Sequence, residues 1–159
     1  MAIFGRFTQR AQRAISEAHQ AAIELKQPYV GTEHFLLGLL KDPGPMVGNL
    51  LPEHITYDSV MERVRTILGQ GKHTPSGRID MTPRSKKIIE SSVLESRKLG
   101  HSFVGAEHLW LALLREGEGV AVSLLREMQV DTQNLHRQLY EKLRESEPEA
   151  TDLSGGDES

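Results

Sequence analysis

Residues 25–40 of the chain have the sequence LKQPYVGTEHFLLGLL, and residues 99–114 have the closely similar sequence LGHSFVGAEHLWLALL. The two stretches align at a constant shift of 74 residues, and eight of their sixteen positions are identical. The same shift aligns TQRAQR at residues 8–13 with TPRSKK at residues 82–87. Self-similarity at a fixed distance is the mark of a duplicated structural unit, so the chain contains an internal repeat.

The repeat divides the chain into two copies and a connection. We predict a first copy at about residues 4–69 and a second copy at about residues 82–143. Between them, residues 70–81 are rich in Gly, Pro and polar side chains, which is typical of a linker. A unit of this size buries only a thin core by itself. The two copies are therefore expected to pack together as one domain over residues 1–143.

Each copy has the apolar spacing of helices. Small and apolar residues recur every three or four positions after Thr8, and the pattern returns after Thr82. Thr8 and Thr82 are natural N-caps, and Thr32 is expected to cap a helix that ends at Lys41. No run alternates polar and apolar residues over a useful length, so no strand is predicted. The prediction is an all-α fold of eight helices in two pseudo-twofold four-helix repeats, with third and fourth helices at about 45–51 and 57–69, and at 119–127 and 131–144.

Composition excludes several classes of protein. The chain has 159 residues and 38% apolar side chains, which fits one ordinary domain or two very small ones. It contains no cysteine, so disulfides, thiolate zinc sites, iron–sulfur clusters and cysteine catalysis are excluded. There is neither a run of 18 apolar residues nor an apolar signal core at the N-terminus. We therefore expect a soluble, cytoplasmic protein without a membrane partner.

Charge is unevenly distributed along the chain. Residues 144–159 hold one basic and six acidic residues with a single aliphatic side chain, which predicts a disordered acidic tail. Residues 1–143 hold 18 basic and 16 acidic residues and are nearly neutral. A nearly neutral domain lacks the basic patch that binding to the phosphate backbone requires. Nucleic acid is therefore not an expected partner.

Two acidic residues at helix starts are candidate ligand contacts. Glu33 and Glu107 each lie in the first turn of a copy's second helix, after a glycine. An acid there can simply complement the helix dipole, or it can face a groove and hold a planar guanidinium through two hydrogen bonds. Thr8 and Thr82 begin the first helices near basic residues, which suits an anion. A ligand with both a phosphate and a guanidinium would fit one such pair in each copy, Thr8 with Glu33 and Thr82 with Glu107.

Motifs for a metal or a nucleotide are missing. His34 and His108 follow the acids in the order Glu-His, which is not the zincin arrangement, and we expect no metal site. GQGKHT at residues 69–74 imitates part of a phosphate loop, but Thr66 stands where the motif needs its first glycine. We therefore expect no cofactor, no catalytic residues and no enzymatic activity.

The paired motifs resemble a known family. FTQRAQR and VGTEHFLLGLL in the first copy, with MTPRSKK and VGAEHLWLALLREGEGVA in the second, are similar to the Clp N-terminal repeat domain of ClpC-type AAA+ unfoldases. The resemblance covers about residues 4–143. It implies an all-α bundle that docks adaptors or damaged clients for an ATP-driven unfoldase and protease. It also implies recognition of phosphorylated arginine on client proteins.

The resemblance assigns roles to individual residues. It implies that Glu33 and Glu107 hold the guanidinium and that Thr8 and Thr82 lie beside the phosphate. Weaker candidates for phosphate contact, placed by motif position, are Arg10, Arg84 and Lys86. Ala106 stands where the family usually has Thr, and we expect this to remove a helix cap and to make the two sites unequal.

The resulting hypothesis is a stand-alone, non-enzymatic module that binds peptides or phosphoarginine-marked clients in the Clp system. Its expected partners are a Clp AAA+ unfoldase, adaptor proteins and marked clients. The alternative is a structural docking protein or competitor that regulates a Clp ATPase without a ligand pocket of its own. A small helical enzyme or a nucleic-acid regulator is a third class, and it has neither a catalytic constellation nor a basic patch in its favour.

Overall fold

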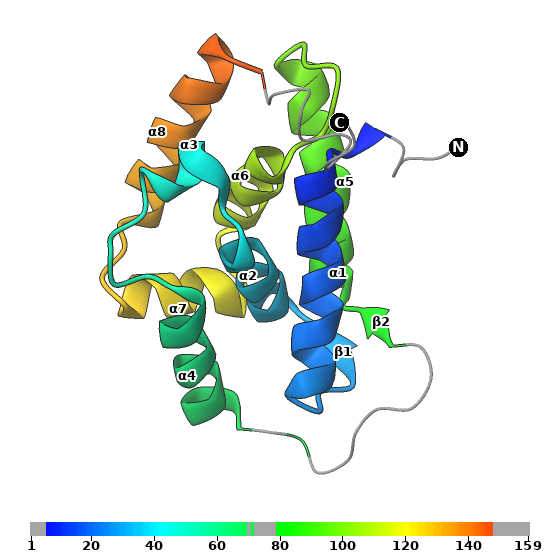
Figure 1. Cartoon of the computed structure of the whole chain (residues 1–159), viewed down its shortest axis with the longest axis vertical. Helices are drawn as coiled ribbons and strands as arrows, with labels where there is room; N and C mark the ends of the chain where they lie inside the picture. The colour runs from blue at the N-terminus through cyan, green and yellow to red at the C-terminus, as the bar shows by residue number, and fades with distance from the viewer. Residues whose placement is uncertain (1–5, 70, 72–78, 148–159) are drawn as a thin grey trace, which may run out of the picture.

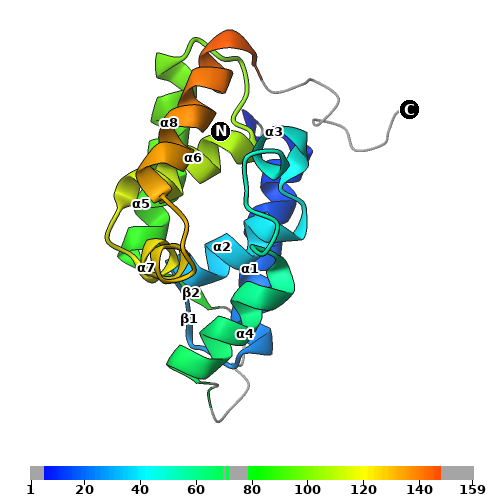
Figure 2. The same cartoon turned by 90° about the vertical axis from the view of Figure 1, so that its left-hand side faces the viewer.

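The computed structural model describes residues 6–69, 71 and 79–147, and this part of the chain is mostly helical (Figure 1). The predicted all-α fold with eight helices is confirmed. The copies lie side by side in Figure 2, with the first four helices on the right and the last four on the left. The elements are α1 (Gln9–Glu24), β1 (Tyr29–Val30), α2 (Thr32–Lys41), α3 (Gly44–Gly48), α4 (Tyr57–Leu68), β2 (Asp80–Met81), α5 (Pro83–Lys98), α6 (Ala106–Glu116), α7 (Val120–Glu127) and α8 (Thr132–Glu145).

The first helix of each copy begins where the sequence predicts. The Thr8 hydroxyl accepts the backbone N–H of Ala11, and the Thr82 hydroxyl accepts that of Ser85. Both threonines have extended backbone, as an N-cap requires. Pro83 occupies the first helical position of α5, where the N–H it lacks would have had no helical partner.

The prediction that Thr32 caps the second helix is wrong. The N-cap position belongs to Gly31 in α2 and to Gly105 in α6, and each glycine donates its N–H to the Nδ1 atom of the histidine three residues later. Thr32 is already the first helical residue, so its hydroxyl points out of its own helix and accepts the N–H of Ala121 in α7 at 3.2 Å. Consequently Ala106 does not deprive α6 of a cap.

One hydrophobic core extends through both copies. Nearly every side chain of α2 and α6 is buried, because these two helices lie between the others. The predicted close approach of helices through small residues is found between α1 and α2. A Cβ atom added to Gly38 would lie 2.3 Å from the carbonyl oxygen of Ala14 and 2.8 Å from the nitrogen of Ala18. Glycine at position 38 is therefore required by this contact.

Two short parallel pairings join the copies, and the sequence did not predict them. β1 pairs with β2, with Val30 opposite Met81, and a second bridge pairs Phe7 with Val104. The shift of 74 residues relates the two pairings, since Phe7 corresponds to Met81 and Val104 to Val30. Strands of two residues are too short for an alternating pattern, and they form only because the copies dock.

The predicted linker and tail fall largely outside the described residues. Positions 70, 72–78 and 148–159 are not described, and residues 79–81 lead into α5 through β2. Helix α8 continues to Glu145, so the first residues of the predicted tail are helical. No helix in the described ranges combines the length and the apolar character needed to cross a bilayer.

Candidate ligand-binding site

The threonines and the glutamates are brought together across the copies. The backbone N–H of Thr82 donates to the carbonyl of Val30 at 3.0 Å, and that of Thr8 donates to the carbonyl of Val104 at 2.9 Å. Thr82 therefore lies beside the turn that leads to Glu33, and Thr8 lies beside the turn that leads to Glu107. The sequence predicted each pair within one copy, and the structure instead builds each pair from both copies.

A cavity of about 590 Å³ lies where the starts of three helices meet. Its wall is formed by Gly31 and Thr32 at the start of α2, by Thr82 and Pro83 at the start of α5, and by Gly119 and Val120 at the start of α7. Figure 2 shows α7 directly above β1 and β2 and beside α2. The remaining lining residues are Arg84, Lys87 and Glu116.

This convergence makes the cavity favourable for an anion. Each helix N-terminus carries about half a positive charge, and its first N–H groups have no partner inside the helix. Among the residues that the structure describes, the backbone N–H groups of Arg84 and Val120 have no hydrogen-bond acceptor. Lys87 adds a full positive charge to the wall. An anion in the cavity would accept from donors of all these kinds.

The Glu33 carboxylate lies against this cavity at Gly31. A Cβ atom added to Gly31 would come within 2.6 Å of Glu33 Oε1, so the glycine makes room for the folded-back side chain. The side chain is 13% exposed, and burial raises the pKa of the carboxyl, against which the hydrogen bond from its own backbone N–H acts. Within residues 6–69, 71 and 79–147, no lysine or arginine forms an ion pair with it. A mostly buried carboxylate without a cation is suited to receive one from a ligand.

His34 does not serve as that cation. Its Nδ1 atom lies 4.0 Å from Glu33 Oε2, within the usual distance of an ion pair. However, burial lowers the pKa of His34 to about 4, and its Nδ1 atom accepts the N–H of Gly31. The ring is therefore neutral and presents a lone pair on that side. Its role is to fix the turn that positions Glu33.

The two predicted arginines are engaged in equivalent ion pairs. Arg84 Nε lies 2.6 Å from Glu116 Oε2, and Arg10 Nε lies 3.1 Å from Asp42 Oδ2. The shift of 74 residues relates the two pairs. Glu116 also accepts the N–H of Gly119 and so fixes the loop before α7. Arg84 therefore lines the cavity with its guanidinium bound to that loop.

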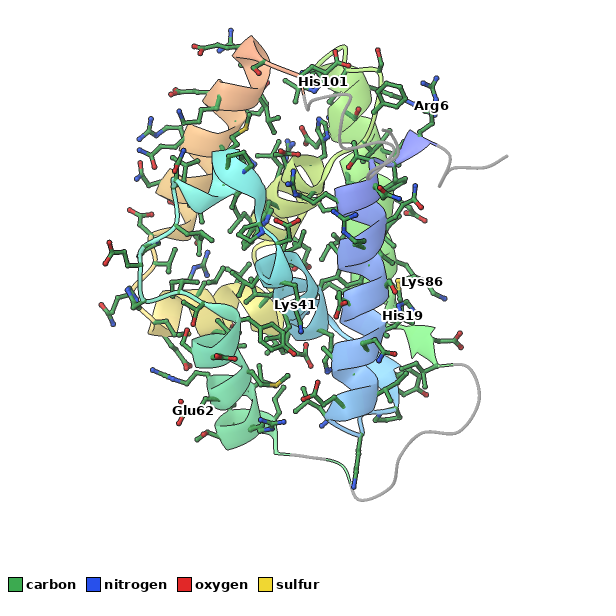
Figure 3. All side chains as sticks on the ribbon, viewed as in Figure 1. Arg6, His19, Lys41, Glu62, Lys86 and His101 are labelled. Carbon is green, nitrogen blue, oxygen red and sulfur yellow. The ribbon has the colours of Figure 1, made fainter. Side chains whose placement is uncertain are left out.

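Lys86 does not line the cavity, whereas Lys87 does. In Figure 3, Lys86 points outward at the right-hand edge of the molecule. Sequence reasoning missed Lys87, although it lies three residues after Arg84 and hence on the same face of α5. It also missed Glu116 and Gly119, since nothing in the repeat places the start of α7 beside Thr82.

The second place, at Thr8 and Glu107, is built from equivalent segments. Both residues are buried there, and Ala106 occupies the position that corresponds to Thr32. His108 holds the turn through the N–H of Gly105, as His34 does in the first copy. The two places share their backbone frame and differ in the side chains around it.

Comparison with known proteins agrees with this architecture. The model of the Clp repeat (R) N-terminal domain matches residues 6–109 and 95–157. The ATP-binding subunit ClpC of the ATP-dependent Clp protease is 42% identical over 142 residues in Staphylococcus epidermidis and in Staphylococcus aureus. The aligned region covers 89% of this chain but only 17% of each ClpC subunit.

Solved structures of N-domains have the same fold. The N-terminal domain of ClpD from Arabidopsis thaliana superposes with a TM-score of 0.75 at 27% identity, over 90% of this chain and 97% of that chain. The ClpV N-domain in complex with a VipB peptide gives a TM-score of 0.65 at 19% identity, over 99% of this chain and 92% of that chain, and this likeness concerns the fold alone. The duplicated motifs, the eight helices and the family match lead to one conclusion: the chain belongs to the Clp repeat N-terminal domain family.

Proposed function

We propose that the chain is a non-enzymatic module that captures peptide segments of client or adaptor proteins for a Clp unfoldase in the cytoplasm. Membership of the Clp repeat family supports this role. A ClpV N-domain of the same fold has been solved with a VipB peptide, which is consistent with peptide binding by such domains. An open cavity at the meeting point of three helices gives this chain a place for a peptide side chain.

The proposed mark on the client is phosphoarginine. Its phosphate would accept from the starts of α5 and α7 and from Lys87, and its guanidinium would face the Glu33 carboxylate. The observation that carries this proposal is a mostly buried carboxylate without a basic partner, next to a cavity that favours an anion. Opposite charges at neighbouring points of one ligand would satisfy both.

The test is a calorimetric titration with a peptide that contains one phosphoarginine. Replacing Glu33 with Gln removes the charge without changing the shape, and we expect affinity to fall at least about tenfold, since a charge-assisted hydrogen bond contributes roughly 1.5–3 kcal/mol. The matched control is Glu90→Gln, which removes an exposed charge from the middle of α5. The unmodified arginine peptide is expected to bind weakly to every variant.

The same titration separates the two places. Glu107→Gln tests the second place, and we propose that the sites are unequal because Ala106 replaces Thr32 at one of them. Equal losses from Glu33→Gln and Glu107→Gln would count against unequal sites. If the folded protein bound no phosphoarginine peptide but retained a Clp partner after both substitutions, the alternative of a docking protein without a ligand pocket would replace this proposal.

A further inference from the structure

A second, apolar cavity adjoins the first one. It has a volume of about 270 Å³ and lies between the end of α4 and the start of α7. Its apolar wall is formed by Ile67, Leu68, Val120 and Leu124. Ile67 is 48% exposed and Leu68 is 42% exposed, which is unusual for large aliphatic side chains at a helix end. These side chains lose no contact with water on folding, so they contribute little to stability where they stand.

The internal repeat provides a control for what the fold requires. The equivalent cavity in the other copy lies between α3 and α8, where Lys142 corresponds to Ile67 and Met46 corresponds to Val120. That groove is also lined by Glu145 and Ser146 and is therefore largely polar. Because the same backbone folds with a charged wall in one copy, the exposed apolar wall of the other copy is not needed to form the fold.

The two neighbouring cavities are continuous along one wall. Arg84, Glu118, Gly119 and Val120 line both of them. A peptide with one side chain in the larger cavity would therefore place a nearby side chain in the apolar one. In an extended peptide, side chains two residues apart lie on the same side and about 7 Å from each other.

Charge at the rim narrows the kind of side chain that fits. Glu118 is highly exposed, and Glu127 lines the far end of the apolar cavity. An acidic side chain would lose hydration and meet these carboxylates, whereas an aliphatic one would bury apolar area against Ile67 and Leu68. The wall therefore favours aliphatic over polar and acidic side chains.

We infer that this apolar cavity is a specificity subsite, which selects peptides with an aliphatic residue two positions from the phosphoarginine. The inference rests on the proposed function of the larger cavity and adds a preference for sequence around the mark. The equivalent polar groove would not share this preference, so the two copies would differ in the clients they select.

The experiment compares phosphoarginine peptides that differ only at the two positions two residues away. Each position carries Leu, Ser or Asp in turn, and calorimetry gives the dissociation constants. We expect Leu at one of the two positions to bind about tenfold more tightly than Ser, since burial of an aliphatic side chain is of that order, and Asp to bind most weakly. The variant Ile67→Ser with Leu68→Ser should lose the preference for Leu while it retains the affinity for the Ser peptide.

A matched control is Leu94→Ser, which removes a 53% exposed leucine from the other end of α5. It should retain the preference, and circular dichroism should give the same helix content for all variants. Equal affinity for the Leu and Ser peptides in the unchanged chain, or a preference that survives in the Ile67 and Leu68 variant, would overturn the subsite alone. Failure of every phosphoarginine peptide to bind would overturn the proposed function and the subsite together.

Discussion

At the scale of single residues, two histidines perform a task that sequence reasoning gave to a threonine. His34 and His108 accept the N–H of the N-cap glycine, at 2.8 Å and 2.9 Å, and so position the acid that precedes each of them. His108 has a further partner, since its Nε2 atom lies 2.9 Å from Nδ1 of His101. With Nδ1 of His108 used as an acceptor, the proton lies on Nε2 and is donated to His101.

The neutral histidines predict how stability depends on pH. Burial lowers the pKa of His34 to about 4, and burial together with His101 lowers that of His108 to about 3, against 6.5 in the unfolded chain. The folded state therefore binds fewer protons than the unfolded state below pH 6.5. Stability is fully present above that pH and falls as the pH is lowered toward the folded pKa values, by about 1.4 kcal/mol per pH unit for each histidine.

Urea denaturation at a series of pH values between about 7.5 and 4.5 measures this dependence. The slope should become smaller when His34 and His108 are replaced with Gln, because an amide keeps an acceptor for the glycine N–H and has no proton to gain. A free energy of unfolding that did not change across this range would contradict the assignment of both rings as buried and neutral.

Thr32 predicts a second effect at this scale. Replacing Thr32 with Val retains the shape but leaves the buried N–H of Ala121 without its acceptor. We expect a loss of roughly 1–3 kcal/mol in the free energy of unfolding, the cost of an unsatisfied buried donor. Thr66→Val, on an exposed face of α4, is the control and should change stability little. A similar small change in both variants would show that the hydrogen bond across the copies is unimportant.

At the scale of helices, the contact between α1 and α2 depends on one missing side chain. Gly38→Ala would place a methyl group against the backbone of Ala14 and Ala18, and neither helix can yield without moving as a whole. We expect a destabilisation of about 1–3 kcal/mol, typical of overpacking, measured by chemical denaturation. Gly48→Ala in α3 is the matched control, since its added carbon meets nothing within 4 Å and it should be neutral or slightly stabilising.

The helices could be predicted because their signals are local. Periodic apolar residues after Thr8 and Thr82 define α1 and α5, and both threonines cap them as expected. The start of α2 was less clear, because glycine and histidine together replace a hydroxyl cap there, and no simple pattern encodes that pair. The strands have two residues each and exist only through contact between the copies, so no local pattern marks them.

At the scale of the whole molecule, the copies are held together at several points. Besides the two short pairings, the Thr32 hydroxyl accepts an N–H of α7, and His54 Nε2 contacts the carbonyl of Met128 at 2.7 Å. One apolar core runs through both copies. A molecule with such shared contacts should unfold in a single transition.

The only tryptophan of the sequence, Trp110 in the second copy, provides the measurement. Its fluorescence and the far-ultraviolet circular dichroism should give the same unfolding midpoint. Gly38→Ala lies in the first copy, and it should nevertheless shift the Trp110 transition as much as the dichroism. Two separate midpoints would indicate that the copies unfold independently.

The composition of the candidate site could be predicted only in part. The repeat marks Glu33 and Thr82 as positions of interest, because it states which residues are equivalent. It does not state which copy packs on which, so the pairing of Thr82 with the turn of Glu33 emerged from the fold alone. For the same reason Lys87, Glu116 and Gly119 were missed, since they reach the cavity through the packing of α5 and α7.

The exchange of segments between the copies resembles a symmetric homodimer fused into one polypeptide. Thr8 donates to the second copy at Val104, and Thr82 donates to the first copy at Val30, so each half completes the other. Two fragments that correspond to the copies, produced together as separate chains, should therefore assemble into a heterodimer with both sites formed. Neither fragment alone should bind the ligand, and this reconstitution would make binding a direct reporter of the encounter between the two halves.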